Sequence, residues 1–375
     1  MPTLEFWFDY ACPWAYLAST RVEALAERIG ARLSWRPMLL GGVFRAVGTP
    51  QNLATTLSPQ KARNELVDRA RWASLLGVPL DAPPEHPRRT VEALRATLAR
   101  GCDPAVIHAF FRAYWSERRA IEDPAVVRAI AGDVDLDAQR EPLRAATDEA
   151  IAKGVFGAPA LILDGELYWG LDRMTLLEPP APAPTATGRH TVEFFFDFSS
   201  PYAYLASTQV DRLDAEVTWR PMLLGAVFQA VGTHDVPLFS FSEPKRRHAI
   251  ADFSRWASRW GADFTFASRF PLRTVTPLRA FLAHPDPVPF AHRVFRAAWV
   301  EDRDVADRAV LADLGASPEV LAADRKQALF DATAYALGHG VFGAPAFLVD
   351  GKWLFWGQDR LQLVERVLAG WVPPA

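Results

Sequence analysis

Short apolar segments that predict β-strands recur at matching places in the two halves of the chain. Residues 4–8 and 192–196 are almost entirely apolar, as expected of a strand that is covered on both faces. In each half a second strand follows, and then, after a long interval, a pair of strands joined by a tight Asp-Gly turn. These further strands are predicted at 32–35, 160–163 and 167–169 in the first half and at 216–219, 346–349 and 353–355 in the second.

Helical periodicity accounts for most of the remaining sequence. Pro13 and Pro201 stand where a proline favours the first turn of a helix. Residues 58–150 and 242–336 carry amphipathic patterns with charged faces. The order strand, helix, strand, helical region, two strands and helix predicts an α/β protein with two thioredoxin-like domains, each with an inserted all-helical subdomain. An amphipathic helix over 361–368 closes the second half, whereas the first half keeps only a short piece of it.

Three motifs show that the chain is a tandem duplication. Phe-Asp-Tyr-Ala-Cys-Pro-Trp-Ala-Tyr-Leu (8–17) returns as Phe-Asp-Phe-Ser-Ser-Pro-Tyr-Ala-Tyr-Leu (196–205). Trp-Arg-Pro-Met-Leu-Leu-Gly and Gly-Val-Phe-Gly-Ala-Pro-Ala also occur once in each half. Alternating prolines between the copies predict an extended linker that has no reason to pack. We therefore expect a first domain over 1–178, a linker over 179–190 and a second domain over 191–375.

The composition is that of an ordinary globular protein and argues against several functions. The chain has 375 residues, 50% of them apolar, and a net charge of -3, so nothing favours nucleic acid or an anionic membrane. No apolar run is long enough to cross a bilayer and the N-terminus lacks a basic signal-peptide region, which predicts a cytoplasmic protein. Two cysteines and eight scattered histidines predict neither a disulfide framework nor a metal site.

The position before the first helix of each half carries the most informative difference between the copies. Cys12 in the first half corresponds to Ser200 in the second. Because a helix N-terminus favours negative charge, a thiol there is expected to have a lowered pKa and to form a thiolate near neutral pH. Ser200 either caps its helix or donates its hydroxyl to an external thiolate. A small buried apolar role is the alternative for Cys12.

An Ala-Pro pair precedes the third strand of each half, as Ala158-Pro159 and Ala344-Pro345. In a thioredoxin-like fold the backbone of the residue before this proline faces a thiol ligand, and the proline is cis. An extended peptide can then pair with that backbone as an added strand. A trans proline that merely begins a strand is the alternative.

Together these motifs resemble the 2-hydroxychromene-2-carboxylate isomerase family, a relative of the kappa-class glutathione transferases within the DsbA-like group. The resemblance rests on residues 196–205, 220–225, 340–345 and 356–361, the last reading Trp-Gly-Gln-Asp-Arg-Leu, and on their counterparts in the first half. It covers nearly the whole chain apart from the linker and the tail. It implies a glutathione-dependent isomerase of aromatic compound catabolism, with glutathione as the cofactor.

The resemblance also implies roles for individual positions. Ser200, and Cys12 in the first copy, would steady the glutathione thiolate and so be catalytic. Glutathione itself would be held by the cis-proline pair, by a lysine and an aspartate seven residues apart on a helix, and by an Asp-Arg pair at the last helix. The implied positions are Ala344, Pro345, Lys245, Asp252, Asp359 and Arg360 in the second copy and Ala158, Pro159, Lys61, Asp68, Asn52, Asp172 and Arg173 in the first. A solvated charged face and ordinary helix capping are the alternatives for the charged residues.

Substrate contacts are suggested by departures from the family pattern and by aromatic residues. Arg89 and Arg273 lie in segments where the family usually has Asn, so an arginine there could hold an anionic substrate. Tyr202 and Trp14, which follow Ser200 and Cys12, could line an apolar pocket for an aromatic substrate, although core packing is the commoner role of such rings.

Three functions are compatible with the sequence. In the first, a glutathione thiolate adds reversibly to a conjugated aromatic 2-oxo acid, and bond rotation and elimination give the isomer. The second is a monothiol disulfide oxidoreductase or glutathione transferase that uses Cys12, without a partner cysteine because Ala15 stands in that place. The third is a non-catalytic binding module. Because members of the family form homodimers, we expect the two halves to pair within the chain as a pseudo-dimer.

Overall fold

Each half of the chain builds its own four-stranded mixed sheet, and the two sheets have the same strand order. The structure is a computed structural model that describes residues 1–51, 56–233 and 236–374. The orders are β2-β1-β3-β4 and β6-β5-β7-β8. In both sheets the first strand is parallel to the second and antiparallel to the third. The strands are β1 (Thr3–Phe8), β2 (Arg32–Pro37), β3 (Ala160–Leu163), β4 (Glu166–Trp169), β5 (Thr191–Phe196), β6 (Glu216–Pro221), β7 (Ala346–Val349) and β8 (Trp353–Trp356).

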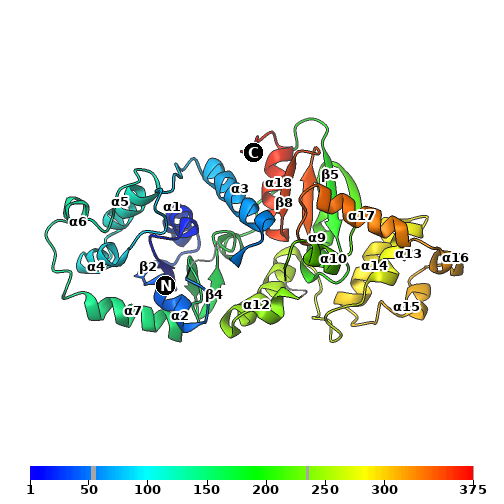
Figure 1. Cartoon of the computed structure of the whole chain (residues 1–375), viewed down its shortest axis with the longest axis horizontal. Coiled ribbons are helices and arrows are strands. Elements are labelled where there is room, and N and C mark those ends of the chain that lie inside the picture. The colour runs from blue at the N-terminus through cyan, green and yellow to red at the C-terminus, as the bar shows by residue number, and fades with distance from the viewer. Residues whose placement is uncertain (52–55, 234–235, 375) are drawn as a thin grey trace.

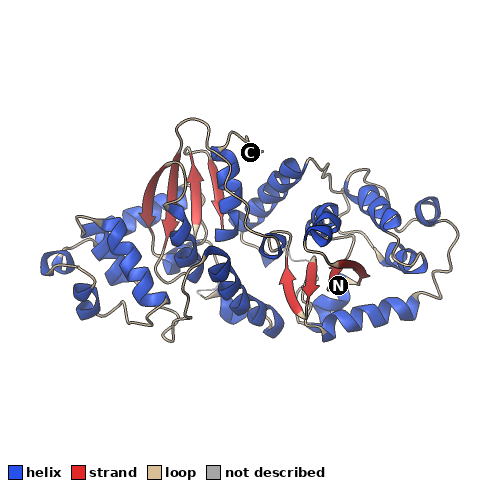
Figure 2. Ribbon diagram, turned by 180° about the vertical axis from the view of Figure 1, so that it is seen from behind, coloured by secondary structure: helices blue, strands red, loops and turns tan. Residues whose placement is uncertain are grey.

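The helices follow the same plan in both halves, and the predicted order of elements is confirmed. The insertions α4–α6 and α13–α16 lie at the two far ends of the molecule, while the sheets lie nearer its middle (Figures 1 and 2). The first half contains α1 (Pro13–Arg28), α2 (Leu40–Ala46), α3 (Pro59–Leu76), α4 (Val91–Ala99), α5 (Pro104–Trp115), α6 (Pro124–Ala131), α7 (Arg140–Ala152) and α8 (Met174–Leu177). The second contains α9 (Pro201–Val210), α10 (Leu224–Ala230), α11 (Pro237–Ser240), α12 (Glu243–Trp260), α13 (Val275–Ala283), α14 (Pro287–Trp299), α15 (Arg308–Asp313), α16 (Pro318–Ala322), α17 (Lys326–Gly338), the 3-10 turn η2 (Gln358–Arg360) and α18 (Leu361–Leu368).

Local sequence explains the sharpest turns and the helix starts. Asp164 and Asp350 adopt positive φ values of 52° and 51° in the two Asp-Gly hairpins, a conformation that Asp tolerates better than most residues. The strands β2 and β6 run two residues further than predicted, to Pro37 and Pro221, since a proline is tolerated at the end of an edge strand.

A buried tryptophan in each helical insertion bonds to the loop that follows the first strand of its domain. The indole nitrogens of Trp115 and Trp299 donate to the carbonyl oxygens of Tyr10 and Phe198, both over 2.8 Å. Both indoles are fully buried, so a donor without a partner there would cost free energy. These bonds hold each insertion against the loop that carries Cys12 or Ser200.

The linker is extended, but it is held at both ends, which the sequence did not predict. Glu178 pairs with Arg28 of α1, and its carbonyl oxygen accepts from Arg259 of α12. Near the other end, the Thr187 N–H donates to the carbonyl oxygen of Leu368 over 2.7 Å. The linker therefore runs over the surface along a defined path between the two domains.

Candidate active site

Cys12 and Ser200 lie immediately before α1 and α9, but they make different hydrogen bonds. The Ser200 hydroxyl accepts from the Ala203 N–H over 3.1 Å and donates to the carbonyl oxygen of Ala344 over 3.1 Å. Cys12 Sγ reaches the carbonyl oxygen of Ala158 over 3.1 Å and makes no capping hydrogen bond. Both side chains are nearly covered, with 6% of Cys12 and 5% of Ser200 exposed. Ser200 therefore caps its helix and also donates a hydrogen bond to the Ala-Pro loop. Cys12 donates to the Ala-Pro loop but does not cap its helix.

The expectation that Cys12 is a thiolate near neutral pH is wrong in this structure. Burial raises the pKa of the Cys12 thiol to about 12. The N–H groups of Ala15 and Trp14 act in the opposite direction but do not outweigh the loss of solvent, and the nearby Asp9 raises the pKa further. The position at a helix N-terminus is therefore not enough to ionise this thiol, because its burial has the larger effect on the pKa.

A buried aspartate in each copy fixes the loop on which Cys12 or Ser200 lies, and sequence reasoning missed it. Asp9 accepts from the N–H groups of Ala11 and Leu40 over 3.0 and 2.8 Å. Asp197 accepts from Ser199 and Leu224 over 2.9 and 2.8 Å. Burial raises the pKa of both carboxyls. The repeated Phe-Asp in the first motif was the available signal, since an acidic residue directly after a buried strand needs partners.

The Ala-Pro loops are closely packed against a tryptophan in each domain. The Ala158–Pro159 and Ala344–Pro345 bonds are cis, the isomer that the motif predicts. A Cβ placed on Gly157 would lie 2.6 Å from Nε1 of Trp169, and one on Gly343 would lie 2.6 Å from Nε1 of Trp356. Glycine is therefore required before each Ala-Pro pair because the indole occupies the space of a side chain.

Each predicted lysine contacts the tryptophan of the other domain. Lys61 Nζ lies 5.3 Å from the ring centre of Trp356, and Lys245 Nζ lies 5.3 Å from that of Trp169. Burial lowers the pKa of Lys61, and burial together with the charge of Lys61 lowers the pKa of Lys245 to about 8. The two lysines are thus close enough to repel each other, and each lies between the domains rather than within one.

The predicted Asp and Arg positions meet in one buried network that joins the domains. Arg173 binds Asp252 over 2.7 Å and also pairs with Asp172 and Asp359. Arg360 makes the matching set of contacts across the interface. It binds Asp68 over 2.7 Å, Asp172 over 2.7 Å and Asp359 over 2.9 Å.

The network, defined by these two arginines and four aspartates, carries an excess of two carboxylates over guanidinium groups. All six side chains are at most 13% exposed. Burial raises the pKa of Asp172, but Arg173 and Arg360 outweigh it and hold the pKa well below its usual range. For Asp359 burial prevails and the pKa is raised. A cationic group near this network would therefore be stabilised.

The Trp-Gly-X-Asp-Arg motif explains how the aspartates enter the network. Gly170 and Gly357 both have φ of 108°, in the left-handed region. A Cβ on them would lie 2.8 Å from Oδ1 of Asp172 and 2.6 Å from Oδ1 of Asp359. Each carboxylate folds back over its glycine, which no other residue would permit.

The remaining predicted positions lie in different surroundings. Arg89 is exposed and pairs with Glu92 over 2.9 Å, whereas Arg273 is exposed and makes no ion pair within the described part of the chain. Trp14 Nε1 donates to Glu65 over 3.3 Å. Burial raises the pKa of Tyr202 far above its ordinary value, so its hydroxyl stays protonated. Asn52 lies outside the described residues.

His248 is a further interface residue, and the sequence gave no reason to select it. Its Nε2 accepts from the Trp169 N–H over 3.1 Å, across the domain boundary, and only 8% of the residue is exposed. Burial lowers its pKa from 6.5 to about 4. The neutral imidazole is therefore the form that the interface requires.

We expect acid to weaken the protein through His248. Because its pKa is lower in the folded state, the stability it contributes is present above about pH 6.5 and is lost as the pH falls towards 4, by up to roughly 3 kcal/mol. His248→Gln keeps an acceptor but no titration, so the free energy of unfolding in urea should depend less on pH in that window. The exposed His339→Gln should leave the dependence unchanged, and an equal dependence in both variants would contradict this assignment.

In the parts of the chain that the structure describes, no three His, Cys, Asp or Glu side chains are arranged to hold a metal ion. Within the same residues no helix combines the length and the apolar character needed to cross a membrane.

Comparison with known proteins defines the class. The model of the DSBA-like thioredoxin domain matches residues 3–179 and again 191–369, so the chain belongs to this family and carries its domain twice. The fold and the duplication expected from the sequence are thereby confirmed.

Curated relatives narrow the class to an isomerase. The 2-hydroxychromene-2-carboxylate isomerase of Sphingobium xenophagum is 32% identical over 191 residues, which cover 47% of this chain and 96% of the relative. That of Pseudomonas putida is 30% identical over 189 residues, 47% of this chain and 92% of the relative. A solved structure of a 2-hydroxychromene-2-carboxylate isomerase is 28% identical, with a TM-score of 0.41, covering 47% of this chain and 92% of that one. The predicted family resemblance is confirmed, and the enzyme class it supports is an isomerase.

Proposed function

We propose that the protein is a glutathione-dependent isomerase of aromatic 2-oxo acids and that the second domain holds the working site. Relatives named 2-hydroxychromene-2-carboxylate isomerase support the reaction class. The observation that carries the choice of domain is the Ser200 hydroxyl, which lies 3.1 Å from the carbonyl oxygen of Ala344. A hydroxyl proton rotates freely, so Ser200 can turn its donor from that carbonyl to a thiolate placed beside it.

Cys12 is poorly suited to the same task. The Cys12 thiol has a pKa of about 12, so it is neutral at physiological pH and is a weaker hydrogen-bond donor than a hydroxyl. The same value argues against the monothiol oxidoreductase alternative, because the thiolate is the attacking form. The first domain then acts mainly by completing the interface.

A chain of aromatic rings near Ser200 supports an aromatic substrate in the second domain. Phe239, which is 60% exposed, lies 6.0 Å from Phe270 between ring centres. Phe270 lies 5.1 Å from Phe266, which lies 5.8 Å from Phe253. Phe253 lies 4.5 Å from Tyr202, two residues after Ser200. These five rings, the aromatic ladder, lead from solvent to the neighbourhood of the serine.

Among its described residues, the first domain has no such ladder. Arg69, Ala82 and His86 stand 184 residues before Phe253, Phe266 and Phe270, which is the offset between the two copies in this region. The two arginines proposed for substrate binding also favour the second domain as the site of the reaction. Arg273, three residues after Phe270, is free to meet a substrate carboxylate, whereas Arg89 is paired with Glu92.

The proposed chemistry needs only positioning and charge control from the protein. In the ring-closed substrate the ring C–O bond first breaks and the hydroxyl proton passes to the phenol oxygen, which gives the conjugated 2-oxo acid. The glutathione sulfur then forms a bond to the carbon at the end of the conjugated system, and the electron pair moves onto the carbonyl oxygen. The former double bond rotates as a single bond. Reversal of the electron flow expels the thiolate, so glutathione is regenerated and nothing is oxidised. Ser200 would stabilise the thiolate, and Arg273 the substrate carboxylate.

Isomerisation should therefore require the free thiol of glutathione. We expect 2-hydroxychromene-2-carboxylate to be converted to its ring-opened isomer, followed by ultraviolet absorbance, at least about 100-fold faster with glutathione than with S-methylglutathione. The S-methyl compound can occupy the site but cannot add to the substrate. Equal rates with both would refute the thiolate mechanism while leaving the isomerase class intact.

The exposed end of the aromatic ladder should affect substrate binding more than chemistry. Phe239→Ala removes a ring that is 60% exposed and far along the ladder from Ser200, so we expect KM for the aromatic acid to rise several-fold with kcat nearly unchanged. Phe330→Ala, a 52% exposed ring on α17, is the matched control and should change neither constant. A fall in kcat alone would contradict the proposed role of the ladder.

A further inference from the structure

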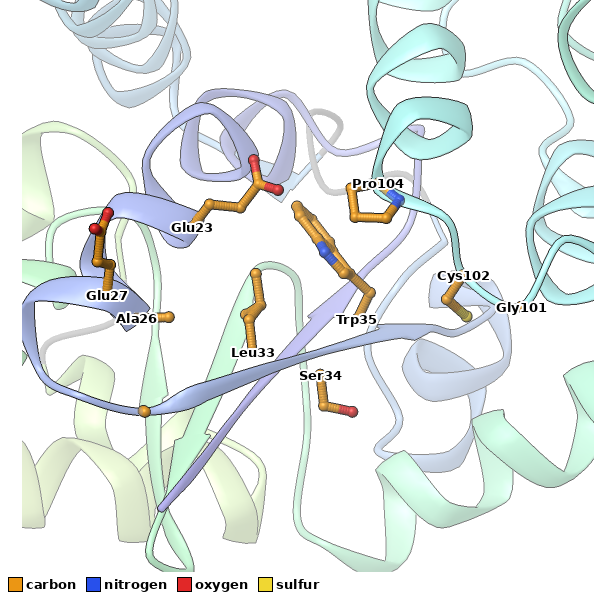
Figure 3. A pocket seen from close by; sticks show the side chains of 10 residues that line it. Glu23, Ala26, Glu27, Leu33, Ser34, Trp35, Gly101, Cys102 and Pro104 are labelled. Atoms are coloured by element: carbon orange, nitrogen blue, oxygen red, sulfur yellow. The ribbon is translucent and has the colours of Figure 1, made fainter. Parts of the chain in front are cut away.

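A cavity lies away from Cys12 and Ser200, along the free edge of the first sheet. It has a volume of about 640 Å³ and lies between the end of α1, the strand β2 and the turn before α5. Figure 3 shows Leu33 and Trp35 on one side of β2 and Ser34 on the other, so the cavity wraps around the strand. A volume of this size accommodates a short segment of another molecule.

The backbone of β2 is unpaired on the side of the cavity. β2 is the outermost strand of its sheet. The N–H groups of Arg32 and Met38 donate to carbonyl oxygens of Pro2 and Phe8, on the β1 side. Because successive residues of a strand alternate in direction, the N–H and carbonyl groups of Leu33 and Trp35 point to the open edge. They form a template for one more strand.

Side chains around the edge favour a cationic occupant that also accepts a hydrogen bond. Glu23 and Glu27 from α1 contribute two exposed carboxylates, and none of the lining residues is lysine or arginine. Glu23 pairs with His108 over 3.0 Å, whereas Glu27 has no side-chain partner in the described part of the chain. Trp35 is 8% exposed, and its indole nitrogen faces the cavity without a partner among the described residues. This indole N–H can therefore donate to an acceptor on an incoming molecule in place of water.

We propose that this cavity, the β2 groove, binds an extended basic peptide segment of a partner protein as a fifth strand. A peptide backbone supplies both the acceptors and the donors that Leu33 and Trp35 lack, and its lysine or arginine side chains meet Glu23 and Glu27. β6 is likewise the outermost strand of its sheet, but α9 ends at Val210 after 10 residues whereas α1 continues for 16, and Ala215 stands at the place of Glu27. The β2 groove belongs to the first domain, whose own thiol site is not used in the proposed reaction.

A labelled peptide of alternating lysine and valine tests the proposal with the full chain. We expect fluorescence anisotropy to show saturable binding at low salt, and Glu23→Lys/Glu27→Lys to weaken it by at least about 10-fold. Asp211→Lys/Asp214→Lys changes the net charge equally beside β6 and should leave binding unchanged. Cys102, which is half-buried in the groove, should be alkylated more slowly when the peptide is bound.

The backbone contacts give a separate measurement. The same peptide with alternate residues N-methylated keeps its charge but loses its strand-pairing N–H groups, so we expect its binding to fall by at least about 10-fold. Equal binding of the N-methylated peptide would overturn the proposal. So would equal losses in the two charge-reversal variants, or binding of spermine as tight as that of the peptide, which would indicate a site for small organic cations.

Discussion

Replacing Ser200 with alanine is expected to lower kcat/KM for the glutathione-dependent isomerisation by about 100-fold. The reason is the loss of the Ser200 hydroxyl, which can donate to a thiolate beside Ala344, and removal of a single preorganised donor typically costs two to three orders of magnitude. The substitution should shift the pH dependence of the rate upward as well, because the bound thiol would ionise less readily. Steady-state rates between pH 6 and 9 measure both effects.

The first domain supplies the matched control for this prediction. Cys12→Ala should change kcat/KM by less than about threefold, because the Cys12 thiol stays neutral and its domain lacks the aromatic ladder. Ser200→Cys should be nearly as inactive as Ser200→Ala, since a thiol at that depth also resists ionisation and donates weakly. A larger loss from Cys12→Ala than from Ser200→Ala would indicate that the working site is in the first domain, and it would support the oxidoreductase alternative.

Replacing Arg360 with methionine is expected to lower the free energy of unfolding by about 3–5 kcal/mol. The substitution leaves Asp68, Asp172 and Asp359 facing one another with a single guanidinium for the whole network, and removing one partner of a buried ion pair has this typical cost. Urea titration followed by far-ultraviolet circular dichroism measures the loss. The transition should also broaden or divide, because the two domains would no longer unfold together.

An exposed ion pair shows how much of that effect is specific to burial. Arg128 pairs with Asp133 over 2.8 Å, but the side chains are 70% and 89% exposed. Arg128→Met should therefore change the free energy of unfolding by less than about 0.5 kcal/mol. A loss for Arg360→Met no larger than that of the control would mean that water reaches the network and replaces the missing guanidinium.

Features set by short stretches of sequence were predictable. The strands, the Asp-Gly hairpins and the prolines at the helix starts follow from local spacing and local conformational preferences. The correspondence of Cys12 and Ser200 followed from the repeat alone. Tandem motifs strengthened each inference, because two independent copies of a pattern had to agree.

Features set by burial and by contacts between the halves were not predictable. The depth that raises the pKa of Cys12 depends on packing around α1 and not on the helix N-terminus alone. Arg360 and Asp68 are far apart in the sequence, and nothing local to either indicates that they meet. The charged positions were expected around glutathione; whether they also contact it stays a prediction, since their visible role is to join the domains.

Joining both halves in one polypeptide makes the closure of the charge network an intramolecular step. Its equilibrium is governed by an effective concentration, on the order of millimolar for a short tether, and not by how much protein the solution contains. Two separate chains with the same faces would come apart on dilution. This chain should keep its specific activity at any dilution. The twelve-residue tether from Pro179 to His190 keeps the two domains close together, so the two halves of the charge network cannot separate.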